Sequence, residues 1–319
     1  MIRKPIIFMF SGQGSHYYQM GRELFEQQPL FRQWLQAGDM ICQSMTGLSI
    51  INTLYNDNYK KTEPFTRTLL THPAIFIVEH GLGQLLLAQG IRPDYVLGAS
   101  LGEFAAAVFA GNLSFETALT AVIKQAQILE EKCLSGSMLA ILASSELYHN
   151  HDFLQKKSEL AASSFHSHFT VSGHPDDLTA VETYLAAQSI NFQRLAVSHA
   201  FHSSHIDDAA ADYQHFINQQ SLGISTTPFI SCAQAKQLNV FPLTHFWDII
   251  RLPIQFKITV ENLEKAGEYY YVDIGPSGTL AAFVKYNLIA SSASQPLTLM
   301  SPFGQDAKNL EHIMEYLTL

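Results

Sequence analysis

A serine between two glycines is the feature of this sequence whose chemistry can be stated first. Residues Gly98 to Gly102 have the pattern Gly-x-Ser-x-Gly, with Ser100 at the centre. An apolar run, residues 95–97, precedes the pattern, and a helix-forming stretch, residues 103–109, follows it. Glycines on both sides permit the sharp strand-to-helix turn that raises a serine hydroxyl to the start of a helix. The pattern predicts that Ser100 is a nucleophile, and the alternative is an ordinary turn serine.

A serine nucleophile needs a base, and the sequence contains 14 histidines that could supply one. An unperturbed imidazole titrates near neutral pH, which makes histidine the side chain most often used as a general base. The residues alone do not single out one histidine, because most histidines of a protein lie on the surface or in caps.

Length and composition limit the class of protein. A chain of 319 residues with 47% hydrophobic content buries a sizeable core, as one large domain or two unequal ones. A net charge of −9 argues against a nucleic-acid binder. The cysteines (Cys42, Cys133 and Cys232) have no paired spacing, so neither a disulfide framework nor a metal site is predicted. The apolar run at the start is too short for a signal peptide, and we expect a cytoplasmic protein without a membrane segment.

The elements expected around Ser100 alternate between strands and helices. Strands are predicted at residues 5–10 and 93–97. A helix is predicted from Thr71, as its N-cap, to about residue 90, and a second helix begins at the N-cap Ser114. This alternation is typical of an α/β domain with a parallel sheet wrapped by helices.

The middle of the chain has a different order of elements. The expected elements are strands at residues 137–142, 169–172 and 192–197, with a helix through residues 178–185 between the last two. This order predicts a small α+β domain, residues 134–198, inserted into a large domain of residues 1–133 and 199–319. Strands at residues 227–231 and 269–274 then return to the large sheet.

Five short motifs occur in the order found in a known enzyme family. They are Ser-Gly-Gln-Gly-Ser at residues 11–15, Gly-Ala-Ser-Leu-Gly-Glu at 98–103, Val-Ser-His-Ala-Phe-His-Ser at 197–203, Pro-Ile-Gln-Phe at 253–256 and Asp-Ile-Gly-Pro at 273–276. Together they resemble the malonyl-CoA:acyl-carrier-protein transacylase family, which includes the acyltransferase domains of polyketide synthases. The match runs nearly end to end. It implies a large α/β-hydrolase-like domain with a parallel sheet, an inserted ferredoxin-like small domain, and a substrate cleft between them.

The resemblance also implies catalytic roles. His202 takes the place of the family's catalytic base toward Ser100, and the backbone carbonyl of Gln255 takes the place of the group that orients it. A carbonyl acceptor on Nδ1–H leaves Nε2 free to accept the serine proton. The backbone N–H groups of Gln13 and Leu101 would bind the oxyanion that forms when a serine attacks a thioester.

Three positions depart from the family pattern. Ala99 stands where relatives usually have histidine, Gln125 where they have arginine, and Ser164 where they commonly have an asparagine beside the substrate. The arginine pairs bidentately with the carboxylate of malonyl units, and a neutral glutamine leaves that carboxylate without a counter-charge. In contrast, the motif that contains His199 and Phe201 resembles the malonyl type. We give more weight to the missing cation and expect malonyl to be a poor substrate.

Free-standing members that lack the arginine resemble the acyl hydrolases of polyketide systems whose acyltransferases act in trans. We therefore expect an enzyme that removes acyl groups such as acetyl from carrier proteins through a Ser-His acyl-enzyme. The expected partners are acyl carrier proteins and polyketide synthase modules, not nucleic acid or membranes. No cofactor is expected beyond the phosphopantetheine or coenzyme A that carries the substrate. Two alternatives stay open: a trans-acting acyltransferase that loads carrier proteins, and a catalytically inactive docking partner.

Overall fold

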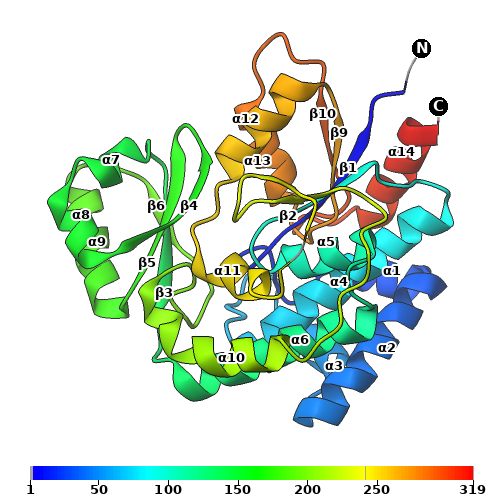
Figure 1. Cartoon of the computed structure of the whole chain (residues 1–319), viewed down its shortest axis with the longest axis horizontal. Coiled ribbons are helices and arrows are strands. Elements are labelled where there is room, and N and C mark those ends of the chain that lie inside the picture. The colour runs from blue at the N-terminus through cyan, green and yellow to red at the C-terminus, as the bar shows by residue number, and fades with distance from the viewer. Residues whose placement is uncertain (1–2, 241, 319) are drawn as a thin grey trace.

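The computed structural model describes residues 3–240 and 242–318, which form two sheets with helices packed around them (Figure 1). The strands of the large sheet are β1 (Ile6–Phe10), β2 (Tyr95–Gly98), β7 (Phe229–Ser231), β8 (Lys236–Leu238), β9 (Tyr270–Asp273) and β10 (Gln295–Thr298). Their order is β10-β9-β1-β2-β7-β8, and only the pair β7–β8 among them is antiparallel. The predicted α/β class with a largely parallel sheet is confirmed.

Helices cover both faces of this sheet. They are α1 (Arg22–Gln27), α2 (Pro29–Thr46), α3 (Ile50–Leu54), α4 (Thr68–Ala88), α5 (Gly102–Ala110), α6 (Phe115–Lys132), α10 (Ala210–Ile217), α11 (His245–Arg251), α12 (Phe256–Ala266), α13 (Thr279–Asn287) and α14 (Asp306–Thr318), with the 3₁₀ helix η1 (Ser204–Ala209). Strand β1 is buried at every position, as a central parallel strand must be. Its Phe8 and Phe10 belong to one apolar cluster and its Ile7 and Met9 to another, because successive side chains point to opposite faces.

The small domain is built on a second, antiparallel sheet. Its elements are β3 (Ser137–Ile141), α7 (Glu146–His149), α8 (Asp152–Lys157), β4 (Glu159–Phe165), β5 (His168–Gly173), α9 (Pro175–Ala187) and β6 (Phe192–Arg194). The strand order β4-β5-β3-β6 is that of a ferredoxin-like fold. These elements lie within residues 134–198, although the exact domain boundaries stay a prediction.

Three elements differ from the sequence-based expectation. The strand expected at residues 192–197 ends at Arg194. Helix α4 begins at Thr68, so Thr71 is not its N-cap and Pro73 lies inside it. Pro73 is the sixth residue of α4, so the helix lacks the backbone N–H that would donate to the Leu69 carbonyl, and it continues to Ala88 without that bond. Strand β4 was not expected, because its sequence does not alternate between apolar and polar residues. In the structure, its register against β5 shifts twice.

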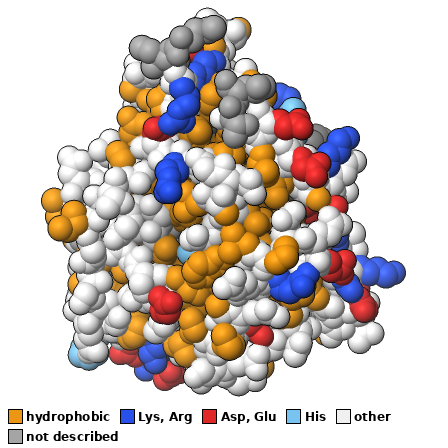
Figure 2. Space-filling model, turned by 90° about the vertical axis from the view of Figure 1, so that its right-hand side faces the viewer, with side chains coloured by type: hydrophobic (Ala, Val, Ile, Leu, Met, Phe, Trp, Pro, Cys, Tyr) orange, Lys and Arg blue, Asp and Glu red, His pale blue; other side chains and the backbone are white. Residues whose placement is uncertain are grey.

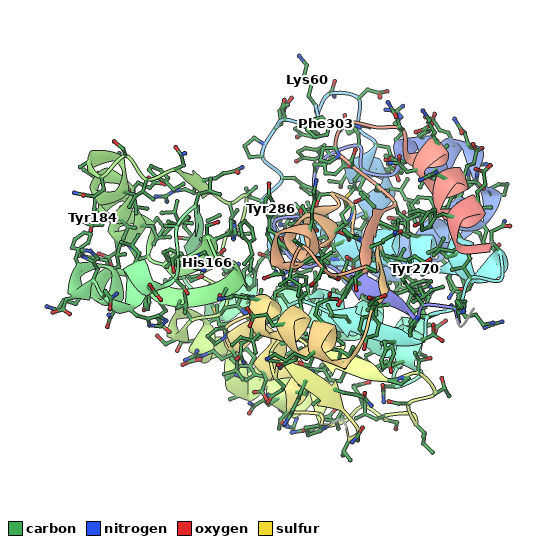
Figure 3. The ribbon with its side chains drawn as sticks, turned by 90° about the horizontal axis from the view of Figure 1, so that it is seen from above. Lys60, His166, Tyr184, Tyr270, Tyr286 and Phe303 are labelled. Carbon is green, nitrogen blue, oxygen red and sulfur yellow. The ribbon has the colours of Figure 1, made fainter. Side chains whose placement is uncertain are left out.

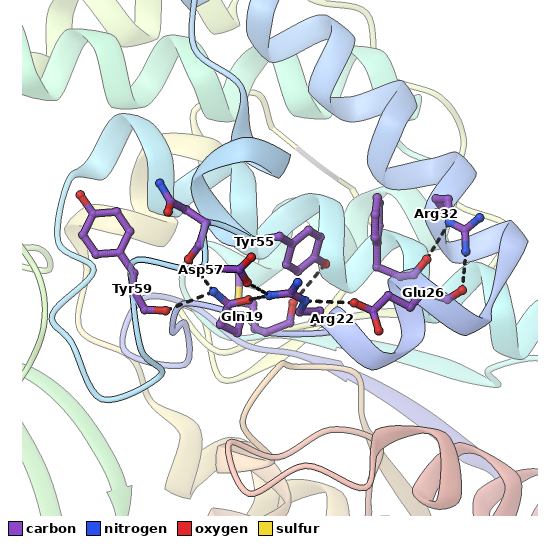
Figure 4. A network of polar contacts seen from close by, with 10 residues as sticks. Gln19, Arg22, Glu26, Arg32, Tyr55, Asp57 and Tyr59 are labelled. Atoms are coloured by element: carbon purple, nitrogen blue, oxygen red, sulfur yellow. Dashed lines mark hydrogen bonds and ion pairs between the residues drawn. The ribbon is translucent and has the colours of Figure 1, made fainter.

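The side of the molecule that carries α1, α2 and α14 is not uniformly polar. Figure 2 shows a band of apolar side chains across this side, with charged side chains around it. At the start of α1, Arg22 donates hydrogen bonds of 3.0 Å to Gln19 and Glu26 and also pairs with Asp57 (Figure 4).

Among the described residues, no helix combines the length and the apolar character that spanning a bilayer requires.

Candidate active site

Ser100 lies in a sharp turn between β2 and α5, as predicted. Its φ of +56° is in the left-handed region, which non-glycine residues rarely adopt. A Cβ on Gly98 would lie 2.4 Å from the Cα of Glu103, and one on Gly102 would lie 2.1 Å from the carbonyl oxygen of Phe10. Only glycine fits at either position, so the crowded turn explains both glycines of the motif.

Ser100 and His202 lie within hydrogen-bond distance of each other. Ser100 Oγ is 2.8 Å from His202 Nε2, and His202 Nδ1 is 2.7 Å from the carbonyl oxygen of Leu252. A carbonyl only accepts, so these partners assign the proton of the neutral ring to Nδ1. The lone pair of Nε2 then faces the serine hydroxyl, which is the arrangement a general base needs.

The group that accepts the Nδ1 proton is not the one predicted. The backbone carbonyl of Gln255 instead accepts hydrogen bonds from the Thr259 backbone N–H at 3.0 Å and the Thr259 hydroxyl at 2.8 Å. Gln255 is the N-cap of α12, so its carbonyl is used within that helix. Leu252 is the C-cap residue of α11, where a carbonyl is free of helical bonding and can point at His202.

Burial sets the charge state of His202. Desolvation lowers the pKa of His202 to about 4, the hydrogen bond to Leu252 acts in the opposite direction, and the Arg251 guanidinium lowers the pKa further. An imidazole with this pKa is neutral at physiological pH. His202 is therefore able to accept a proton over the whole neutral range.

The loop of residues 11–15 lies against the Ser100 turn. A Cβ on Gly12 would be 2.8 Å from Ser100 Cβ and 3.3 Å from the backbone nitrogen of Leu101. Within the described chain, the backbone N–H groups of Gln13 and Leu101 donate to no protein acceptor. Unpaired N–H groups on two adjoining loops are available to an anionic oxygen beside Ser100.

A buried glutamate fixes the start of this loop. One carboxylate oxygen of Glu79 accepts from the Ser11 backbone N–H at 2.6 Å and from the Ser11 hydroxyl at 2.8 Å. Burial raises the pKa of Glu79 well above its ordinary value. The Gln13 side chain is fixed in turn, because its Nε2 donates to the Thr71 hydroxyl at 2.8 Å.

A cavity of about 320 Å³ opens beside Ser100 and His202. From the large domain it is lined by the loop 11–15, Ala99, Ser100, Phe201, His202, Ile254, Phe256, Thr279, Leu280 and Phe283, and from the small domain by Met138, Ala140, Ala162, Ser164, His168, Thr170, Gln193 and Leu195. No lining residue is Asp, Glu, Lys or Arg. In the described part of the chain, no group of three His, Cys, Asp or Glu side chains is placed to hold a metal ion.

The structure brings most of the predicted substrate-binding residues to this cavity, but not all of them. Ala99, Ser164 and Phe201 line it. Gln125 does not: its side chain is buried against α11 and its Nε2 lies 3.4 Å from the Phe246 carbonyl oxygen. His199 does not line it either, because its Nδ1 lies 2.9 Å from the Thr68 hydroxyl.

The two corrections have different physical consequences. Gln125 faces the interior of the large domain, so the expectation that it meets the end of the acyl chain is wrong in this structure. The ring of His199 packs edge-to-face on Phe201 with centroids 5.9 Å apart, so His199 supports a cavity wall from behind.

An aromatic cluster at the junction of the two domains was not predicted. Phe165 stacks on Tyr286 at 4.7 Å and on His168 at 5.2 Å, and His168 packs against Phe283 at 5.0 Å. Figure 3 places Tyr286 on the side of the large domain that faces the small domain, near His166, while Tyr184 lies at the outer end of the small domain. No sequence pattern signals this cluster, since its two halves are more than a hundred positions apart.

Comparisons with known proteins agree with this geometry. The family model "Acyl transferase domain" matches residues 7–318. The polyketide biosynthesis acyltransferase homolog BaeD of Bacillus velezensis is 43% identical over 312 residues, which cover 98% of this chain and 96% of that protein. PksD of Bacillus subtilis, a homolog of the same description, is 40% identical over 317 residues, covering 99% and 98%. The crystal structure of MCAT from Streptococcus pneumoniae is similar with a TM-score of 0.80 at 25% identity, covering 98% of this chain and 99% of that one. The chain belongs to the acyl transferase domain family.

Proposed function

We propose that this protein is an acyl-carrier-protein thioester hydrolase that removes neutral acyl groups, such as acetyl, in polyketide biosynthesis. The observation that carries the proposal is the contact of Ser100 Oγ with His202 Nε2 beside a cavity without charged side chains. The partners would be carrier proteins of polyketide synthase modules, which present the acyl group on a phosphopantetheine thioester. No other cofactor enters the reaction.

The first half of the reaction transfers the acyl group to the serine. Ser100 Oγ attacks the thioester carbonyl while its proton passes to His202 Nε2, and the carbonyl oxygen becomes an oxyanion bound by the N–H groups of Gln13 and Leu101. The carbon–sulfur bond then breaks. The leaving sulfur takes the proton from Nε2, which releases the carrier thiol and leaves an ester on Ser100.

The second half transfers the acyl group to water. A water molecule in the cavity attacks the ester carbonyl and gives its proton to His202 Nε2. The bond to Ser100 Oγ breaks, and the serine oxygen recovers the proton from Nε2. The products are a free carboxylic acid and the starting enzyme, so the cycle needs one water and no oxidant or reductant.

The uncharged cavity favours a neutral acyl group over malonyl. A carboxylate moved from water into this cavity would lose solvation without meeting an arginine or lysine. Met138, Ala140 and Ala162 provide apolar surface for a short acyl chain instead. Gln125 plays no part in this preference, because it does not line the cavity.

A second candidate is a trans-acting acyltransferase. The relatives BaeD and PksD are polyketide biosynthesis acyltransferase homologs, and the same acyl-enzyme would serve either acceptor. The two enzymes differ only in whether water or a thiol reaches the ester on Ser100. An inactive docking partner has no comparable support, since the pairing of Ser100 with His202 is intact.

The experiment incubates the protein with acetyl- and malonyl-loaded carrier protein, with and without a second carrier protein as acceptor, and follows all species by mass spectrometry. We expect free acetate, little transfer, and slow release of malonate. Ser100→Ala is the control for uncatalysed hydrolysis. Transfer of malonyl to the second carrier without release of acetate would reject the hydrolase in favour of the acyltransferase, and the absence of any acyl-enzyme would favour the docking partner.

A further inference from the structure

Glu103 and His245 form a buried hydrogen-bonded pair, which lies outside the cavity lining and has no part in the reaction described above. Glu103 Oε2 is 2.7 Å from His245 Nε2, and the side chains are 0% and 2% exposed, respectively. The other oxygen of Glu103 accepts from the Ser231 hydroxyl at 3.0 Å and from the Ala233 backbone N–H at 3.1 Å. A carboxylate so deeply buried is stable only with such partners, and removal of one partner is strongly destabilising.

The pair joins the helix of the nucleophile to the helix that holds the base. Glu103 is in the first turn of α5, and its backbone N–H donates to the Ser100 carbonyl at 2.9 Å. His245 is the first residue of α11. Thus the hydrogen bond between their side chains connects α11 to the Ser100 turn.

Helix α11 in turn positions His202 through two backbone carbonyls. Ile250 accepts from the His202 backbone N–H at 2.8 Å, and Leu252 accepts from Nδ1 at 2.7 Å. The far end of α11 is held by Arg251, which pairs with Asp207 at 2.5 Å in the 3₁₀ helix that follows His202. The short helix is therefore anchored at both ends, by His245 at its start and by Arg251 at its end.

We propose that Glu103 and His245 are positioning residues that hold the carbonyls of Ile250 and Leu252 in register with the Ser100 turn, and so align His202 Nε2 with Ser100 Oγ. This inference rests on the proposed Ser-His chemistry, but it does not depend on whether water or a thiol accepts the acyl group. Misalignment of reacting groups by about 1 Å is enough to lower a rate by about a hundredfold.

A shift of α11 would also change the proton affinity of His202. The groups near His202 are the Ser100 hydroxyl, the Leu252 carbonyl and the Arg251 guanidinium, and burial is the largest cause of its lowered pKa. Cys232 and Asp248 are the further titratable groups around the pair, each coupled to the charge of Glu103. If the helix loosens and water reaches the ring, the pKa of His202 should rise toward its ordinary value.

The test compares His245→Ala, His245→Gln and Glu103→Gln with the parent. Readouts are the rate at which a fluorophosphonate probe labels the serine, its pH profile, kcat and KM on acetyl-carrier protein, and thermal unfolding. The probe reads Ser100 directly, so a failure of the hydrolase assignment would leave this comparison intact. We expect His245→Ala to lower the labelling rate and kcat by about tenfold to a hundredfold with little change in KM. We also expect the acid limb of the pH profile of labelling to move to higher pH. His245→Gln, which can keep an N–H donor near Glu103, should recover part of the rate.

Asp39→Asn is the matched control. Asp39 is also buried and accepts from the backbone N–H groups of Ile50 and Ile51 at 2.5 and 3.1 Å, but it belongs to α2, away from His202. This variant should lose stability without slowing the labelling of folded protein. Parental labelling rates in folded His245→Ala, or an equal loss of rate in Asp39→Asn, would overturn the proposal.

Discussion

The two sides of the cavity are built differently. On the large-domain side, specific hydrogen bonds fix the residues that we assign to the chemistry. Ser100 Oγ contacts His202 Nε2, His202 Nδ1 contacts the Leu252 carbonyl, and Ser11 of the loop 11–15 donates to buried Glu79. On the small-domain side, the lining comes from an antiparallel sheet and combines apolar side chains, such as those of Ala140 and Ala162, with the polar side chains of Ser164, His168, Thr170 and Gln193. None of these residues takes part in the proposed proton transfers. We therefore expect chemistry and acyl selection to be separable. Changes on the first side should stop the reaction, and changes on the second should alter which acyl group reacts.

The largest effect is expected from the reacting pair on the large-domain side. Ser100→Ala removes the nucleophile and His202→Ala removes its base, so we expect kcat to fall by at least about a thousandfold in each. Release of acetate from acetyl-carrier protein measures both variants. Either variant within tenfold of the parent would contradict the assigned roles. His149→Ala, a change at a histidine on the small domain remote in the fold from this pair, serves as the control.

Gly12→Ala should have the next largest effect. Its new Cβ would approach Ser100 Cβ to 2.8 Å and the Ala99 carbonyl oxygen to 2.9 Å, so the loop 11–15 must move. Loss of one oxyanion donor lowers kcat by about a hundredfold or more. Steady-state kinetics with acetyl-carrier protein checks this. A KM effect alone would mean that the loop binds substrate without binding the oxyanion.

A change on the small-domain side should affect acyl selection and not chemistry. Ala140→Leu fills part of the cavity from β3, and we expect kcat/KM to fall by about tenfold for a butyryl group and less for acetyl. The fluorophosphonate labelling rate should match that of the parent. If labelling slows as much as hydrolysis, the separation between the two sides does not hold.

The smallest effect concerns pH. Because burial lowers the pKa of His202 to about 4, the base stays neutral in mildly acidic solution. A base must be neutral to act, so activity is lost only as pH falls toward the pKa. We expect the fluorophosphonate labelling rate to vary by less than about twofold between pH 5.5 and 8. An acid limb centred near 6.5, the ordinary value for histidine, would show that water reaches the ring.

Short-range patterns in the sequence were sufficient to predict the turn that carries Ser100, but not the groups around it. The Gly98–Gly102 pattern predicts the turn because the residues that the turn requires, the two glycines, are close to Ser100 in the sequence. Leu252 could not be predicted as the acceptor for His202 Nδ1, because every residue has a backbone carbonyl. The carbonyl of Leu252 is placed there by the end of α11, which the sequence pattern does not locate. The inward orientation of Gln125 depends on how α11 packs against α6, which helical periodicity does not report.

The pairing of Glu103 with His245 could not be predicted from the sequence, for a different reason. The two residues are 142 positions apart, and each has an ordinary local setting at the start of a helix. The ferredoxin-like order of the small domain was anticipated, since β3, β5 and α9 have clear patterns. Strand β4, with its irregular register, was not.

Both members of the reacting pair have left-handed backbone conformations, with φ of +56° at Ser100 and +60° at His202. A non-glycine residue in this conformation costs about 1–2 kcal/mol, which the rest of the fold must offset. Activity and thermal stability are therefore opposed at these two positions. Proteins with glycine at position 100 or 202 would be inactive yet would unfold at a higher temperature than their alanine counterparts. A selection for stability alone would therefore keep this backbone geometry and replace the two side chains on which the reaction depends.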